Sequence, residues 1–180
     1  MGQNVLARTA GAVSFAAGLV HVVVALQHLE FAVDLGAFGV TAVLQIAWGA
    51  WLILSPTTPR RSLLWSGAGL QLICCGAWAM SRLSGLPFGS HAWQAQSVGL
   101  LDASVVGVQV VAAALAIGAA VGVQIGRGLA IGLASVVLAA TAGSVGAGLA
   151  LDGGHADHGH DHADDHDDGH DHNDAHDHEH

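Results

Sequence analysis

The C-terminal segment of the chain is rich in side chains that can bind metal ions. Residues 152–180 contain ten of the thirteen His and eleven of the fourteen acidic residues, and no Lys or Arg. Imidazole and carboxylate are both ligands for divalent first-row metals, and a flexible chain can bring several of them to one ion. We therefore predict a metal-binding tail whose ligands are His155, His158, His160, His162, His166, His170, His172, His176, His178 and His180.

The composition of this tail also bears on its order and on the choice of metal. It has no hydrophobic anchor, so it cannot bury enough apolar area to offset chain entropy, and we expect it to be disordered without ligand. It contains no Cys and no fixed four-ligand zinc spacing, which leaves Zn, Ni, Co and Cu open. A purely solubilising tail would not need ten His, and a purification tag is normally an unbroken His run.

A second set of polar residues falls inside apolar stretches of the chain. His21 and His28 are seven residues apart, which places them on one helix face, and Asp102 and Gln109 are spaced in the same way. A His within a membrane helix is a functional candidate. If these faces converge, the bundle could hold or pass an ion at a site made of His21, His28, Asp102, Gln45, Gln71 and Gln109. The alternative is hydrogen bonding between helices, at about 0.6 kcal/mol each.

The two cysteines, Cys74 and Cys75, are adjacent in the third apolar stretch. Their side chains diverge by about 100° on a helix and do not easily share one partner. Two such residues provide neither a disulfide framework nor a CxxC redox motif. We predict that both are small core residues.

The overall composition indicates which elements must position these residues. The chain is 52% apolar and 11% charged, lacks Lys, and has a mean hydropathy of +0.52. This excludes a soluble enzyme domain, a disulfide-stapled secreted module and a basic nucleic-acid binder. We predict an all-α polytopic membrane helix bundle, residues 1–151, followed by the tail, residues 152–180.

Apolar runs about 20 residues long mark the membrane-spanning helices. We predict about five, at residues 10–29, 37–55, 62–80, 98–123 and 129–151, with turn residues and charges between them. A cleaved signal peptide is the alternative for the first run, but that run is long and lacks a clear cleavage site.

Arginine positions predict the orientation in the cell membrane. Arg8, Arg60, Arg61 and Arg127 fall on one side of a five-span bundle, and Arg82 alone falls on the other. Short loops rich in Lys or Arg stay in the cytoplasm, so the N-terminus is predicted to be cytoplasmic and the tail extracytoplasmic. The GxxxG sequence that begins at Gly128 favours helix packing, either within the chain or in a homo-oligomer.

The stretch SRLSGLPFGSHAWQAQSVGLLD, residues 81–102, contains an SRxxGLPxG motif followed by VGLxD. With two His in the first span, this pattern resembles a family of uncharacterised multi-pass bacterial membrane proteins without an established activity. Apart from the resemblance, Gly85, Pro87 and Gly89 predict a tight loop, and Arg82 is placed to pair with Asp102.

These features lead to one expected function and several alternatives. We expect an integral membrane protein that handles a divalent transition metal by capture, buffering, delivery or transport. The main alternative is an accessory subunit of a membrane metalloenzyme or respiratory complex, whose tail loads metal onto a membrane-protein partner. A membrane enzyme or haem protein using His21 and His28 is a third possibility, but no nucleophile motif or nucleotide-binding loop favours an enzyme.

Overall fold

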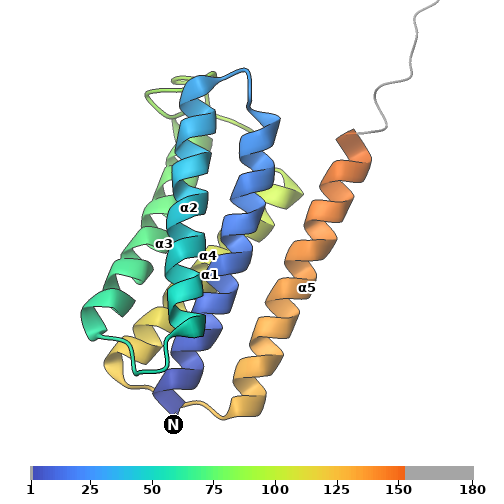
Figure 1. The fold of residues 1–180 in the computed structure, drawn as a ribbon. Helices are drawn as coiled ribbons and strands as arrows, with labels where there is room; N and C mark the ends of the chain where they lie inside the picture. Colours follow the sequence, from blue (N-terminus) through green and yellow to red (C-terminus); the bar gives the residue numbers. More distant parts are fainter. Residues whose placement is uncertain (1, 153–180) are drawn as a thin grey trace, which may run out of the picture.

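The computed structural model describes residues 2–152, which form five α-helices. In chain order they are α1 (Gly2–Gln27), α2 (Ala32–Leu54), α3 (Arg61–Leu83), α4 (Leu100–Val121) and α5 (Arg127–Asp152). Successive helices run in opposite directions (Figure 1). The ten predicted metal ligands of the tail lie outside the described residues.

The bundle is a membrane-spanning fold, as the sequence predicts. Four helices are long and apolar enough to cross a membrane, namely those covering Asn4–Gln27, Ala32–Leu54, Arg61–Leu83 and Asp102–Val121. The apolar part of α5 within the described residues, Gly128–Gly143, is shorter. Large apolar side chains remain on the outside, including Leu83 (83% exposed) and Leu54 (78% exposed), as lipid contact requires.

Helix α1 lies at the centre of the bundle and packs on α2, α4 and α5, whereas α3 packs mainly on α4. Glycines permit the close approach of α1 and α2. A Cβ added at Gly11 or Gly49 would lie 2.8 Å or less from backbone oxygen of the other helix, and one at Gly18 would meet Ile46. Small residues at these points let the two backbones touch.

Trp48 joins α2 to α3 at a second glycine. Its indole nitrogen donates a hydrogen bond to the carbonyl oxygen of Leu63, at 2.9 Å, and only 8% of its surface is exposed. A Cβ at Gly67 would overlap the indole ring. Trp48 is therefore a packing residue between α2 and α3.

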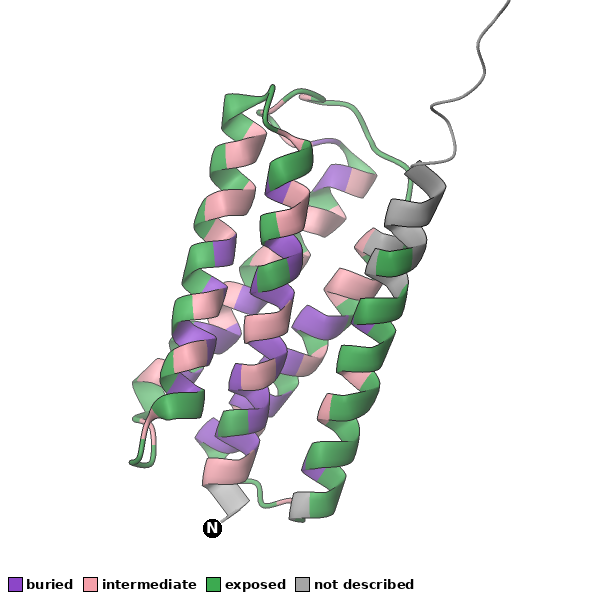
Figure 2. Ribbon diagram, turned by 45° about the vertical axis from the view of Figure 1, so that its right-hand side comes forward, coloured by how far each residue is buried: buried purple, intermediate pink, exposed green. Residues whose placement is uncertain are grey.

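The core between α1 and α4 consists largely of alanine. Ala7, Ala10, Ala112, Ala116 and Ala119 are at most 1% exposed. Buried positions concentrate on the facing sides of these helices, while the outward side of α5 is exposed (Figure 2). Small side chains let α1 and α4 pack closely in this half of the bundle.

The start of α2 differs from the prediction. The sequence predicts a loop at residues 30–36 because two acids interrupt the apolar run, but α2 begins at Ala32 and includes Asp34 in its first turn. An acidic residue there interacts favourably with the positive end of the helix dipole, so Asp34 does not end the helix. The shift brings this carboxylate onto a membrane helix.

Helix α5 packs through Ala130 and Thr141, both buried, rather than through its glycines. A Cβ added at Gly128 or Gly132 would meet nothing within 4 Å. Packing among the described residues therefore does not explain this GxxxG sequence.

The two ends of the bundle carry different charges. The N-terminus and the α2–α3 and α4–α5 connections share one end, where Arg8 donates a hydrogen bond to the Ser55 carbonyl oxygen (Figure 1). The α1–α2 connection, residues 84–99 and the end of α5 at Asp152 share the other end. Four of the five Arg belong to the first end; Glu30, Asp34 and Asp102 belong to the second.

Candidate functional site

A cavity of about 470 Å³ lies among α1, α2, α3, α4 and the loop of residues 84–99. Its lining includes all three histidines of the described chain, His21, His28 and His91. Asp34 and Asp102 also line it. The cavity extends from buried His21 to exposed His91, at the end of the bundle where α5 ends.

His21 and His28 are held in the same tautomer by the backbone of α1. Nδ1 of His21 lies 2.9 Å from the Ala17 carbonyl oxygen, and Nδ1 of His28 lies 2.8 Å from that of Val24. A carbonyl oxygen can only accept a hydrogen bond, so Nδ1 carries the proton in each ring. The Nε2 lone pair of each neutral imidazole is therefore left for another partner.

Phe38 of α2 packs against both of these rings. Its centroid lies 5.2 Å from the His28 ring and 6.1 Å from the His21 ring. The phenyl group limits the rotation of both imidazoles, which are already fixed at Nδ1. The two rings are thus positioned before any ligand arrives.

His91 reaches the cavity from the 84–99 loop and is held through Ser90. Oδ2 of Asp34 accepts hydrogen bonds from the Ser90 backbone nitrogen, at 3.1 Å, and from its hydroxyl, at 2.7 Å. The same hydroxyl oxygen lies 2.8 Å from Nδ1 of His91. Because the hydroxyl proton points to Asp34, Nδ1 of His91 donates, and its Nε2 has no partner among the described residues.

The loop that carries His91 depends on its glycines. Gly85 and Gly89 have φ values of +79° and +92°, which side-chain-bearing residues rarely adopt. A Cβ at Gly89 would also collide with the carboxylate of Asp34. The prediction of a tight glycine-dependent loop is confirmed.

Gln109 of α4 faces His21 across the inner end of the cavity. Its side-chain nitrogen lies 3.5 Å from Nε2 of His21, and its oxygen accepts a hydrogen bond from the Cys75 thiol at 3.8 Å. Gln109 is 2% exposed. This weak, long contact is the single described hydrogen bond to Nε2 of His21.

A second polar layer closes the bundle below this pair. Gln45 donates to the side-chain oxygen of Gln71 at 3.0 Å, and Gln71 donates to Ser14 at 2.8 Å. Ser14 in turn donates to the Gln45 carbonyl oxygen at 3.2 Å, and all three residues are fully buried. These residues do not line the cavity, so we place Gln45 and Gln71 in a structural layer.

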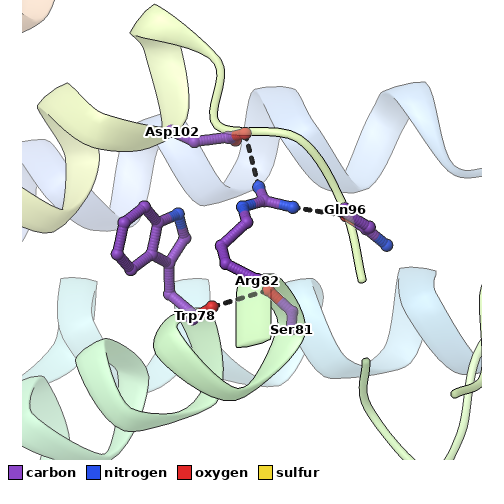
Figure 3. A network of polar contacts seen from close by, with 5 residues as sticks. All are labelled: Trp78, Ser81, Arg82, Gln96 and Asp102. Atoms are coloured by element: carbon purple, nitrogen blue, oxygen red, sulfur yellow. Dashed lines mark hydrogen bonds and ion pairs between the residues drawn. The ribbon is translucent and has the colours of Figure 1, made fainter. Parts of the chain in front are cut away.

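The wall formed by α3 and α4 carries an ion pair, as predicted. Nη2 of Arg82 lies 2.5 Å from Oδ2 of Asp102, and Nη1 donates to Gln96 at 2.7 Å. The guanidinium lies 5.8 Å from the Trp78 ring centroid (Figure 3). Arg82 thus joins α3 to α4 and to the 84–99 loop.

The structure brings together four of the six residues predicted for the intramembrane site. His21, His28, Asp102 and Gln109 line the cavity, whereas Gln45 and Gln71 bond to each other beneath it. Sequence reasoning missed Asp34, which it placed in a loop. It also missed Cys74, which lines the cavity rather than a closed core.

The cavity has ligand atoms but no closed metal cage. Within residues 2–152, no group of three or more His, Cys, Asp or Glu side chains is arranged to hold one metal ion. The cavity is also much larger than an ion. Ligand atoms therefore lie along its walls rather than around one point.

Comparisons with protein-family models, with curated proteins and with solved structures found no match to this chain. The chemical interpretation therefore rests on the geometry. The arrangement offers oriented imidazole Nε2 atoms, two carboxylates and a thiol along one cavity at the acidic end of a membrane bundle. Such groups can exchange a cation between neighbouring positions, or bind it with water or other ligands completing its coordination.

Proposed function

We propose that this membrane protein binds a divalent transition-metal ion in the histidine-lined cavity and exchanges it with the His-rich tail. One observation carries the proposal: His21, His28 and His91 all line one cavity, and each has Nδ1 bonded to an oxygen atom. Metal-binding histidines commonly donate their second ring N–H to an oxygen, which fixes the tautomer and raises the basicity of the ligating nitrogen.

The position of the tail supports exchange with this cavity. Helix α5 ends at Asp152, at the same end of the bundle as the 84–99 loop (Figure 1). The 28 residues that follow could span at most about 3.3–3.6 Å each, which exceeds the length of the bundle. The tail is therefore long enough for its histidines to reach the cavity mouth of the same chain.

The charge distribution supports an orientation and a divalent cargo. Four arginines at one end favour placing that end in the cytoplasm, with the cavity mouth and tail on the opposite side of the cell membrane. The charges of Asp34 and of the acidic tail raise the local concentration of cations there. Zn, Ni, Co and Cu(II) share the preference for imidazole that this ligand set offers.

The test is metal analysis of purified full-length protein. We compare a parent in which the ten tail His are replaced by Asn with the same protein carrying His21→Ala and His28→Ala. After loading with Zn²⁺ and desalting, the parent should retain about one ion per chain and the double variant should lose it. His91→Asn tests the outer position of the cavity, and we expect it to lose less zinc than the double variant. An equal zinc content in parent and double variant would contradict the proposal.

A further inference from the structure

Asp102 presents its carboxylate to the cavity, whereas its partner Arg82 lies behind it. Asp102 lines the cavity and 42% of its side chain is exposed; Arg82 does not line it and is 12% exposed. The 2.5 Å contact between them means that Asp102 is already neutralised by a cation from the protein. A metal ion that enters the cavity therefore competes with Arg82 for the Asp102 carboxylate.

The guanidinium of Arg82 is incompletely bonded in this position. Nη1 and Nη2 have partners in Gln96 and Asp102, but Nε is buried and has no hydrogen-bond partner within the described part of the chain. A buried donor without a partner carries a free-energy cost. That cost lowers the work needed to move Arg82 away from Asp102.

The charges of the cavity favour such an exchange when a divalent ion binds. With neutral histidines, Asp34 and Asp102 contribute two negative charges and Arg82 one positive charge. A divalent ion added to this set leaves one excess positive charge, and Arg82 and the ion repel each other. If Arg82 leaves Asp102, the two carboxylates balance the ion.

We propose that Arg82 is an internal counter-ion for Asp102. In the metal-free protein it is paired with the Asp102 carboxylate, and when a divalent cation binds, this ion pair opens and the carboxylate interacts with the cation instead. This inference rests on the proposed function and adds its regulation: Arg82 sets the affinity of the cavity. Gln96 of the 84–99 loop accepts a hydrogen bond from Arg82. Opening of the ion pair therefore also alters the hydrogen bond that connects this loop to α3.

A purely structural brace is the competing role for Arg82, and variants separate the two. Arg82→Gln removes the competing charge, and Arg82→Lys keeps it. Asp102→Asn removes the contested carboxylate. Gln96→Ala breaks the loop contact and leaves the ion pair, so it is the matched control for bracing.

The experiment is a Co²⁺ titration of full-length protein in nanodiscs, with the ten tail His replaced by Asn, followed by ligand-field absorption. Arg82→Gln should tighten the Co²⁺ dissociation constant about tenfold, and Arg82→Lys should stay within about threefold of the parent. Asp102→Asn should weaken binding about tenfold. Adding Arg82→Gln to Asp102→Asn should change nothing further, since Arg82 acts only through Asp102.

Two results would overturn the inference. One is His21-dependent Co²⁺ binding that Arg82→Gln leaves unchanged or weakens. The other is tightening by Gln96→Ala equal to that by Arg82→Gln, which would assign the effect to the loop. Failure of the proposed function is distinct, because Co²⁺ binding would then be absent or insensitive to His21→Ala in the parent.

A second measurement applies if Arg82→Gln does not fold. Zn²⁺ has no d–d transitions, so it does not quench tryptophan fluorescence directly. The guanidinium of Arg82 lies 5.8 Å from the Trp78 ring centroid, so movement of Arg82 on zinc binding should change the emission of Trp78. The change should occur in the parent and disappear in Trp78→Phe and in Asp102→Asn. An unchanged parent spectrum at saturating zinc would contradict the inference.

Discussion

Nε2 of His21 lies 3.5 Å from the side-chain nitrogen of Gln109, across the inner end of the cavity, although 88 residues separate them in the chain. Nδ1 of His21 is already committed to Ala17, so Gln109 faces the lone pair of the ring. An oxygen in place of the amide nitrogen would put two metal ligands close together.

Gln109→Glu should strengthen metal binding in the cavity. The substitution keeps the shape of the side chain and adds a carboxylate oxygen beside Nε2 of His21. We expect the Co²⁺ dissociation constant to fall about tenfold in the parent with Asn in place of the tail histidines. Gln71→Glu is the matched control, because Gln71 is as buried but does not line the cavity. Equal tightening by both variants would show that added negative charge alone is responsible.

Asp34→Asn should loosen the 84–99 loop. The carboxylate accepts two hydrogen bonds from Ser90, and these connect the loop to α2. An amide accepts more weakly than a carboxylate, so hydrogen exchange at residues 84–99 should accelerate about tenfold. Glu30→Gln, an exposed neutralisation at the same end, should leave exchange in this loop unchanged. No acceleration in Asp34→Asn would mean that the loop is held by its other contacts.

Gly67→Ala should destabilise the bundle by about 2 kcal/mol or more, because its Cβ would overlap the Trp48 ring and displace it from Leu63. Gly69→Ala lies on the same helix, where a Cβ meets nothing within 4 Å. That control should be neutral or slightly stabilising, since Ala favours helix over Gly. Thermal unfolding in detergent compares the two. A similar melting temperature for both variants would contradict the described packing.

Metal capture by the tail should be lost on acidification. An imidazole must be neutral to bind metal, and its ordinary pKa is about 6.5. Zn²⁺ bound by full-length protein should therefore fall as the pH is lowered from 8 to 5, with the midpoint moved below 6.5 by the competition between metal and proton. The protein with Asn in place of the ten tail His should lack this component. A pH-independent difference between the two proteins would point to carboxylates as the ligands.

The helices and the loop could be predicted from the sequence because strong local signals specify them. Long apolar runs require helices in lipid, and the GLPFG segment contains the glycines that positive φ angles require. The Arg82–Asp102 pair was predictable because each residue lies near the end of a helix joined by one loop. His21 and His28 share a face by simple spacing.

Other parts of the site depend on how the helices are rotated and at what depth they meet, which no single segment specifies. Gln45, Gln71 and Gln109 are all glutamines within apolar helices, so the sequence does not distinguish them. Gln45 and Gln71 nevertheless hydrogen-bond to each other below the cavity. Cys74 faces the cavity although its apolar neighbours predicted a closed core. Asp34 was misplaced because an acid was read as the end of a helix, whereas the first turn of a helix favours it.

Metal binding by His21 and His28 can be observed directly by ¹⁵N NMR of histidine in the protein whose tail carries Asn in place of His. Before metal is added, His21 and His28 should both show the tautomer protonated at Nδ1. On Zn²⁺ binding, the Nε2 signals of both should shift from lone-pair to coordinated values while Nδ1 remains protonated. If both rings keep their metal-free spectra at zinc concentrations that saturate the full-length protein, the cavity does not bind the metal.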